Sequence, residues 1–324
     1  MDRQPGTNVR MMWAGALALL YGLGAHAAFQ TNWGNVLIGT LSISFLLLTP
    51  MTIGAITVAL SPARVRTSLV YAIFAPWAPC CLLGGIAVFL QRELALCVGM
   101  ALPIFLPLSS VGGVLVAVAC RWRGAPFRSN GAAMGLLIML PFLFAPIERQ
   151  IAPTAQVRTV ESSVTIEADA QTVWQHFVVV PTIQESEQRI AWFRLLGLPQ
   201  PVEAVLSQAG AHGMRHARYS NGMAVIEPIV EWQPHRRYAF EVHLDPEAPL
   251  PSPLWRAADD NDHLDIQRVE YEIEPQSGGE VVLHLRTTYR LATPFNSYSG
   301  RWVDFLLADF ESYILRIVKG RAEL

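Results

Sequence analysis

The sequence predicts two structural classes in one chain: a membrane α-helical bundle of about five transmembrane helices over residues 1–150, and an α+β domain over residues 151–324. Three observations support this prediction. Five long apolar runs in the first part hold no Asp, Glu, Lys or Arg in their cores. After residue 157, charged residues recur every few positions and the expected strands alternate between apolar and polar side chains. Residues 297–319 form an amphipathic helical pattern, so we expect a curved antiparallel sheet wrapped on a long C-terminal helix.

Composition and charge change at the same place. The mean hydropathy of +0.31 and the charged fraction of 15% are typical of a partly embedded protein. Residues 1–150 hold nine arginines and three acidic residues, whereas residues 151–324 hold 15 basic and 23 acidic side chains. Nucleic acid requires a basic surface, so we expect no nucleic-acid partner. All four cysteines lie in apolar runs, which leaves the C-terminal half without a disulfide or a cysteine-based zinc site.

The apolar runs predict transmembrane helices at about residues 11–29, 35–60, 67–90, 94–119 and 131–147. A helix that crosses a bilayer needs about 20 residues at about 1.5 Å each, and the first four runs meet this requirement. The fifth run has 17 residues and fits a thin bilayer. Because ionisable side chains are scarce within the runs, we expect a packed anchor; the recurrent prolines are also compatible with a lipid path.

Arginine placement predicts the orientation through the positive-inside rule. Seven arginines fall on one side of the expected helices and two on the other; the seven are Arg3, Arg10, Arg64, Arg66, Arg121, Arg123 and Arg128, and the two are Arg92 and Arg149. We therefore expect a multi-pass protein of a bacterial inner membrane, with a cytoplasmic N-terminus and a periplasmic C-terminal half. Two alternatives remain. A re-entrant fifth run would leave that half in the cytoplasm, and the segment that ends in Ala25-His26-Ala27 resembles a cleavable signal peptide.

Periodicity and turn signals order the elements of the C-terminal half. A strand is expected over residues 159–168, then a helix over 170–179 capped by Asp169, then a second helical stretch over 182–196. Six strands follow, at residues 202–207, 213–219, 223–232, 237–244, 264–274 and 280–291. Asn221-Gly222 between two of them predicts a hairpin. In the later strands apolar and charged side chains alternate, so one face of the sheet is expected to be covered and the other solvated.

Strand, two helices, six strands and a long C-terminal helix is the element order of the helix-grip fold. The segments Val164–Trp174, Gly213–Arg218 and Glu227–Pro234, with the aromatic last helix, resemble the START-like (SRPBCC) superfamily of polyketide cyclases and lipid-transfer domains. The resemblance covers nearly the whole C-terminal half and specifies a fold better than an activity. It implies a cavity between the curved sheet and the last helix, suited to a hydrophobic molecule. A solid core without a cavity is the alternative.

The candidates for the cavity wall come from the expected strands and the last helix. They are Arg215, Tyr219, Tyr238, Phe240, Val242, Tyr271, Leu283, Leu285, Thr287, Tyr289, Trp302, Leu306, Phe310 and Tyr313. The polar members among them are able to fix a ligand headgroup by hydrogen bonds, and no residue is expected to be catalytic. Trp192 and Phe193 are expected to form a flap near the cavity mouth or to rest on the bilayer interface; ordinary packing on the sheet edge is the alternative.

The histidines do not predict a metal site. His212 and His216 are four residues apart, which suits a metal on a helix, but they straddle the start of an expected strand, where this spacing aligns poorly. We expect no metal and no cofactor.

The sequence therefore predicts a membrane-anchored binding protein for a hydrophobic small molecule or lipid, held between the sheet and the last helix. One alternative is an enzyme of the polyketide cyclase or dehydratase type, which a tyrosine or histidine deep in the cavity with a polar partner would favour. The other is a membrane scaffold that binds no ligand. Membrane lipids and the hydrophobic ligand are the expected partners, and the sequence leaves the oligomeric state open.

Overall fold

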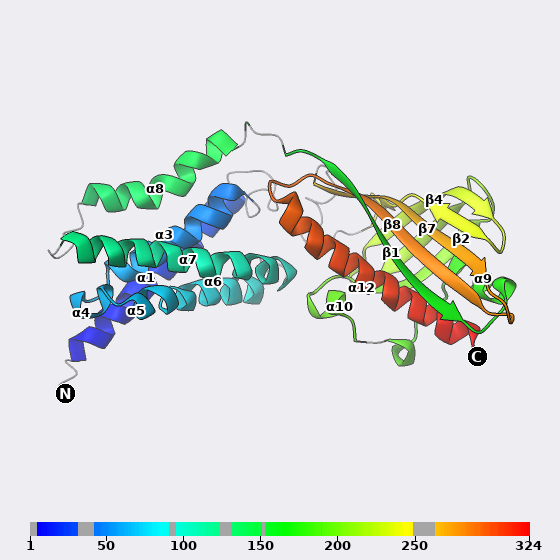
Figure 1. Cartoon of the computed structure of the whole chain (residues 1–324). Coiled ribbons are helices and arrows are strands. Elements are labelled where there is room, and N and C mark those ends of the chain that lie inside the picture. Colours follow the sequence, from blue (N-terminus) through cyan, green and yellow to red (C-terminus); the bar gives the residue numbers. More distant parts are fainter. Residues whose placement is uncertain are drawn as a thin grey trace. The chain divides into compact units, whose positions relative to one another are not determined.

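The computed structural model divides the chain into two compact units, Met1–Ala152 and Pro153–Leu324 (Figure 1). It describes residues 5–31, 42–90, 95–123, 131–148, 150, 153–188, 190–248 and 263–324.

The N-terminal unit is helical. Its elements are α1 (Pro5–Thr31), the π-helical turn η1 (Ser44–Leu48), α3 (Thr49–Ala59), α4 (Ala63–Arg66), α5 (Leu69–Phe74), α6 (Trp77–Phe89), α7 (Ala95–Arg123) and α8 (Gly131–Glu148). α3 packs against α1 and α7, and ten of its eleven residues are buried. A helix that is apolar on all sides belongs in the interior of such a unit, so α3 forms its centre.

Glycine allows α3 and α7 to approach backbone to backbone. A Cβ atom at Gly54 of α3 would overlap the carbonyl oxygen of Ser109, and one at Gly112 of α7 would overlap the carbonyl oxygen of Met51. Small residues at helix crossings permit this close approach in membrane proteins. The crossing therefore depends on both glycines.

Three helices are long and apolar enough to cross a membrane: Gly6–Phe29, Leu69–Phe89 and Ala95–Trp122. Two further apolar helices, Ser44–Ala59 and Gly135–Glu148, are shorter. The predicted count of five spans is therefore not supported by the described part of the chain. At about 1.5 Å per residue, Ser44–Ala59 covers only about 24 Å, less than a hydrocarbon core of about 30 Å. Residues 35–41 and 94 of the expected second and fourth runs lie outside the described residues.

The C-terminal unit combines one antiparallel sheet with helices. Its elements are β1 (Gln156–Ile166), α9 (Ala170–Val178), the 3-10 turn η2 (Glu185–Glu187), α10 (Trp192–Leu195), β2 (Pro201–Gln208), β3 (Met214–Tyr219), β4 (Ala224–Gln233), β5 (Arg237–Phe240), β6 (His243–Leu244), β7 (Leu264–Pro275), β8 (Val281–Leu291) and α12 (Asn296–Ala322). Asp169 caps α9 as predicted, since its carboxylate accepts from the backbone N–H groups of Gln171 and Thr172.

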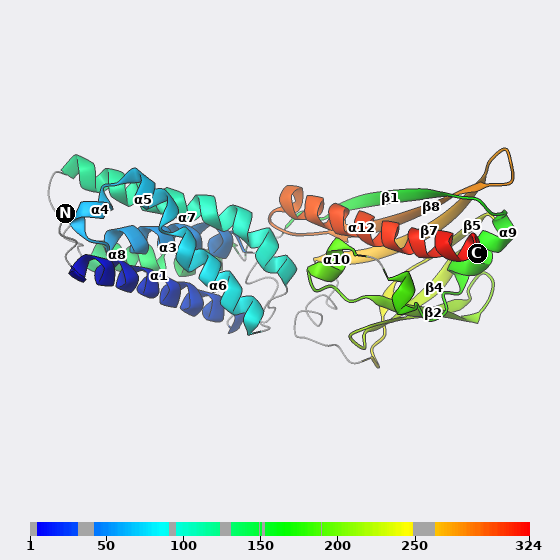
Figure 2. The ribbon, with the colours of Figure 1, turned by 90° about the horizontal axis from the view of Figure 1, so that it is seen from below.

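The sheet order is β1-β8-β7-β5-β4-β3-β2, and β6 pairs with β4. α12 lies along one face of this sheet (Figures 1 and 2), packing against β1 and β8. The predicted antiparallel sheet with a long C-terminal helix is therefore confirmed. Its hydrophobic face turns toward α12 because the strands alternate: along β8 every second residue from Val281 to Leu291 is buried.

Two predicted elements are wrong. Residues 182–196 form only η2 and α10, because Ile183 is extended and its backbone N–H donates to the carbonyl of Val202 at 2.8 Å. The expected strand 237–244 is interrupted after Phe240. β5 pairs with β4 and β7, whereas β6 pairs with β4 alone. Val242 lies at this break between the two strands.

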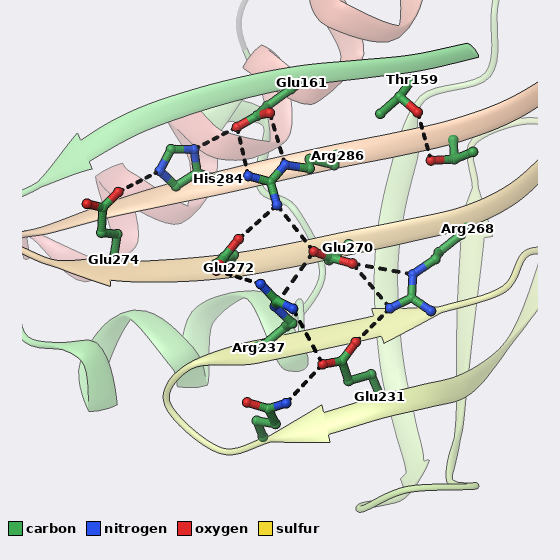
Figure 3. A network of polar contacts seen from close by, with 12 residues as sticks. Thr159, Glu161, Glu231, Arg237, Arg268, Glu270, Glu272, Glu274, His284 and Arg286 are labelled. Carbon is green, nitrogen blue, oxygen red and sulfur yellow. Dashed lines mark hydrogen bonds and ion pairs between the residues drawn. The ribbon is translucent and has the colours of Figure 1, made fainter. Parts of the chain in front are cut away.

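The outer face of the sheet carries a network of ion pairs (Figure 3). Its members are Glu161, Glu231, Arg237, Arg268, Glu270, Glu272, Glu274, His284 and Arg286. Arg286 of β8 contacts Glu161 of β1 at 2.9 Å and Glu272 of β7 at 2.8 Å, so one guanidinium joins three strands. Networks of this kind stabilise a surface more than isolated exposed pairs do.

Candidate ligand cavity

A cavity of about 260 Å³ lies between the sheet and α12. Its wall is formed mainly by apolar side chains from both elements, among them Ala204, Ala217, Phe240, Leu285, Leu306 and Ile314. The same wall holds seven residues with polar side chains: Glu203, Arg215, Tyr219, Glu227, Tyr271, Thr287 and Glu311. An apolar wall with a few converging polar groups is the usual construction of a small-molecule site.

The structure brings nine of the predicted residues together on this wall. They are Arg215, Tyr219, Phe240, Val242, Tyr271, Leu285, Thr287, Leu306 and Phe310. Strand alternation accounts for the pattern: Arg215, Ala217 and Tyr219 share one face of β3, and the residues between them face away. Val242, at the break after β5, also lies on the wall, and its neighbours Glu241 and His243 are exposed.

The other five predicted residues lie away from the cavity wall. Tyr238, Leu283 and Tyr313 are buried in the core. The hydroxyl of Tyr289 donates to the Asp304 carboxylate at 2.7 Å, and Asp304 also pairs with Arg158. Trp302 is partly exposed on α12.

Arg215 and Glu227 form a buried ion pair on the wall. They are register partners on β3 and β4, and each side chain is only 6% exposed. Burial raises the pKa of Glu227, and the guanidinium of Arg215 works against this rise. The guanidinium carbon of Arg215 lies 5.3 Å from the centroid of the Phe240 ring, within the range of a cation–π contact. Its Nε atom has no hydrogen-bond partner among the described residues.

Two tyrosines on the cavity wall, Tyr219 and Tyr271, add to the polar group formed by Arg215 and Glu227. Burial raises the pKa of both phenols above their usual value, and the charge of Glu227 adds to the rise while Arg215 opposes it. Both are therefore neutral at physiological pH, so each keeps a proton to donate to a ligand oxygen.

A second carboxyl group lies on the helix side of the cavity. Glu311 of α12 is 1% exposed, and neither of its side-chain oxygens has a hydrogen-bond partner of normal geometry among the described residues. Burial raises its pKa, and the nearby hydroxyls of Thr287 and Ser162 oppose the rise. A buried carboxyl without a cation beside it favours its protonated form.

The sequence analysis missed Glu227 and Glu311, although a signal existed for each. Arg215 and Glu227 lie six residues on either side of Asn221, so the predicted hairpin already places opposite charges in the same region of two paired strands. Glu311 follows Phe310 on the apolar side of the last helix, where an acidic residue is out of place.

The predicted flap is the short helix α10. Phe193 is 1% exposed, lies on the cavity wall, and makes edge contacts with the rings of Phe310 and Tyr313 at 5.3 Å between centroids. Its backbone N–H donates to the Asp309 carboxylate of α12 at 2.9 Å. Trp192 is not among the residues that line the cavity and is 56% exposed. α10 is therefore part of the cavity wall on one side and of the surface on the other.

The described residues contain no group of three or more His, Cys, Asp or Glu side chains positioned to hold a metal ion. His212 lies in a turn with a positive φ of 66°, and His216 lies on β3.

No protein-family model matches the sequence, and no curated protein matches it. Solved structures do resemble about half of the chain. An aromatase/cyclase from Streptomyces sp. R1128 is 13% identical, with 52% of this chain and 94% of that chain covered and a TM-score of 0.33. A START superfamily protein from Mycobacterium smegmatis is 12% identical, with 51% and 97% covered and a TM-score of 0.34. Similarity at this level assigns neither a family nor an activity to the chain.

Proposed function

We propose that the chain is a membrane-anchored protein that binds a hydrophobic small molecule carrying at least one hydrogen-bonding group. The observation that carries this proposal is the cavity between the sheet and α12, with its apolar wall and its cluster of Arg215, Glu227, Tyr219 and Tyr271. Apolar burial at about 25 cal/mol per Å² would supply most of the affinity. The neutral tyrosine hydroxyls would orient the ligand by donating hydrogen bonds.

The cavity volume limits the ligand. About 260 Å³ lies just below the usual range of about 300–1,000 Å³ for small-molecule pockets. The ligand we propose is therefore compact, for example a single acyl chain or a small fused-ring molecule. A lipid with two acyl chains would require the cavity to enlarge.

Two observations favour binding over the alternative functions. The raised pKa values of Tyr219 and Tyr271 keep both phenols protonated at neutral pH, so neither supplies a phenolate base. A cyclase or dehydratase would instead need a polar partner that activates such a group. A core of well-packed apolar residues is often at least as stable as one that contains a buried ion pair. A cavity with buried charges therefore fits a ligand-binding protein better than a scaffold that binds no ligand.

The proposed address is the extracytoplasmic side of a bacterial inner membrane. Three long apolar helices, either alone or together with both shorter ones, give an odd number of crossings from a cytoplasmic N-terminus. α1 packs against α3 and α6 and buries Phe29, which favours its retention over cleavage as a signal peptide. A reporter fused after Leu324 that is active only outside the cytoplasm tests this address. An inactive fusion made in normal amounts would contradict it.

Native mass spectrometry of the full-length protein, released from detergent in the gas phase, tests the binding function. We expect the wild-type protein to carry a hydrophobic adduct of defined mass. Ala217→Phe, which places a ring in the cavity, should lose the adduct, whereas Val205→Phe on an exposed position of β2 should keep it. A wild-type protein that never carries an adduct, or a filled variant that carries the same one, would overturn the proposal.

A further inference from the structure

Four large apolar side chains are exposed on and beside α10. The exposed fraction is 88% for Ile190, 56% for Trp192, 63% for Leu195 and 44% for Phe305. α10 packs on α12 (Figure 2). The ring centroids of Trp192 and Phe305 lie 6.4 Å apart. We call these four residues the α10–α12 patch. Large exposed apolar side chains that gather in one place mark an interaction surface rather than ordinary scatter.

We propose that the α10–α12 patch docks on the surface of a lipid bilayer. The chemistry of the patch fits this partner, because tryptophan and phenylalanine beside aliphatic residues is the composition of segments that settle into the interfacial region. Arg301 lies one turn before Phe305, is exposed, and forms no ion pair with any described residue. Its free charge complements the phosphate of an anionic lipid headgroup.

The connection between the apolar helix α8 and α12 is short, so a bilayer that contacts α8 is also close to the patch. The apolar helix α8 ends at Glu148, and Asn296 at the start of α12 donates from its side-chain nitrogen to the carbonyl of Thr154 at 2.6 Å. The six residues from Glu148 to Thr154 span at most about 20 Å. Phe305 lies nine residues along α12 from Asn296, or about 14 Å. With the separation of Thr154 from Asn296 included, Phe305 stays within about 45 Å of the end of α8.

The surface of α8 is apolar and suits contact with lipid. Its exposed side chains include Leu136, Leu143, Phe144 and Ile147. The docking proposal rests on the anchoring part of the proposed function, but it does not depend on the identity of the cavity ligand. Docking also bears on how the cavity ligand could enter. Phe193 lies between the docking residues Trp192 and Leu195 and contributes to the cavity wall, so docking would place part of that wall against the bilayer.

Photo-crosslinking of the full-length protein tests the proposal. p-Benzoylphenylalanine replaces Trp192, Phe305 or the control residue Val205, which is 49% exposed on β2. Each variant is reconstituted in vesicles of phosphatidylethanolamine and phosphatidylglycerol, and lipid adducts are measured on the isolated peptides. We expect at least about tenfold more lipid adduct at Trp192 and Phe305 than at Val205. Arg301→Gln should lower the yield in these vesicles but not in vesicles of phosphatidylcholine alone.

Three results would overturn the docking proposal: equal adducts at all three positions, no lipid adduct at either patch position, or adducts to a second copy of the chain in place of lipid. Resistance of the protein to alkaline carbonate extraction reports on anchoring alone. Native mass spectrometry reports on the cavity ligand alone. A protein that stays in the membrane and keeps its ligand, yet gives no lipid adduct at the patch, would disprove docking and leave the proposed function intact.

Discussion

The buried pair Arg215–Glu227 allows a quantitative test of the cavity wall. Glu227→Gln removes the negative partner and leaves a buried guanidinium, which cannot lose its proton. With both side chains only 6% exposed, removal of one partner is expected to destabilise the C-terminal unit by about 3–5 kcal/mol. For a unit of this size about 1 kcal/mol corresponds to about 2–4 °C, so Tm should fall by about 6–20 °C.

Thermal unfolding of the full-length protein in detergent, followed by circular dichroism of the sheet, measures this change. Arg218→Gln is the matched control on the same strand. Arg218 also pairs with a glutamate but is 68% exposed, so its loss should change the free energy of unfolding by less than about 1 kcal/mol. Equal, small changes in the two variants would refute the claim that Arg215 and Glu227 form a buried charge pair.

The pH dependence of Arg215→Met provides an independent test of the same pair. Without the guanidinium the main opposition to the effect of burial is lost, so the pKa of Glu227 rises further above that of the unfolded chain. A carboxyl with a raised pKa contributes stability at low pH and loses it as the pH rises through the folded-state pKa. Arg215→Met should therefore be less destabilised at pH 5 than at pH 8. Glu227→Gln should show no such recovery, and a parallel recovery in both variants would contradict this account.

Three further predictions follow from other contacts. Glu311→Gln should gain thermal stability relative to the wild type as the pH rises from about 4 to 8, because burial raises the pKa of Glu311 and the charged form is disfavoured; a constant difference across this range would contradict it. Gly54→Ala should destabilise the helical unit in detergent by about 1–3 kcal/mol, because its Cβ overlaps the backbone of α7, while Gly85→Ala, with open space around it, should not; equal melting temperatures would contradict it. Asp309→Ala removes the carboxylate that accepts from the Phe193 N–H, a bond worth about 1.5–3 kcal/mol, so amide exchange across α10 should accelerate at least about tenfold; unchanged protection would show that the contact does not hold α10.

Periodicity predicted most of the sheet because its signal is local. β8, with alternating buried and half-buried residues from Val281 to Leu291, and the hairpin at Asn221-Gly222 follow directly from the pattern of side chains. The interruption of the strand expected at residues 237–244 does not follow from the pattern of side chains. Whether residues after Phe240 continue beside β7 or shift to pair with β4 alone depends on contacts with distant strands, which the alternation of Tyr238 and Phe240 does not encode.

The sequence predicted the two sides of the candidate site but not which residues of each side line the cavity. The apolar faces of the strands and of α12 identify the two sides of the cavity, but they do not distinguish Leu285, which lies on its wall, from Leu283, which lies in the core. That difference depends on how far α12 stands from each strand. The transmembrane count was not supported for a different reason, since hydropathy marks an apolar run without showing where its helix begins, and the described helix Ser44–Ala59 is shorter than a full span.

The charged outer face of the sheet has a consequence for orientation. Among the members of its ion-pair network, five glutamates outnumber three arginines, and His284 lies between two of the glutamates, Glu161 and Glu274. Anionic headgroups repel a surface with an excess of carboxylates. In the membrane-anchored arrangement that we propose, a negatively charged bilayer would repel this side of the unit and favour poses in which these strands face the aqueous phase.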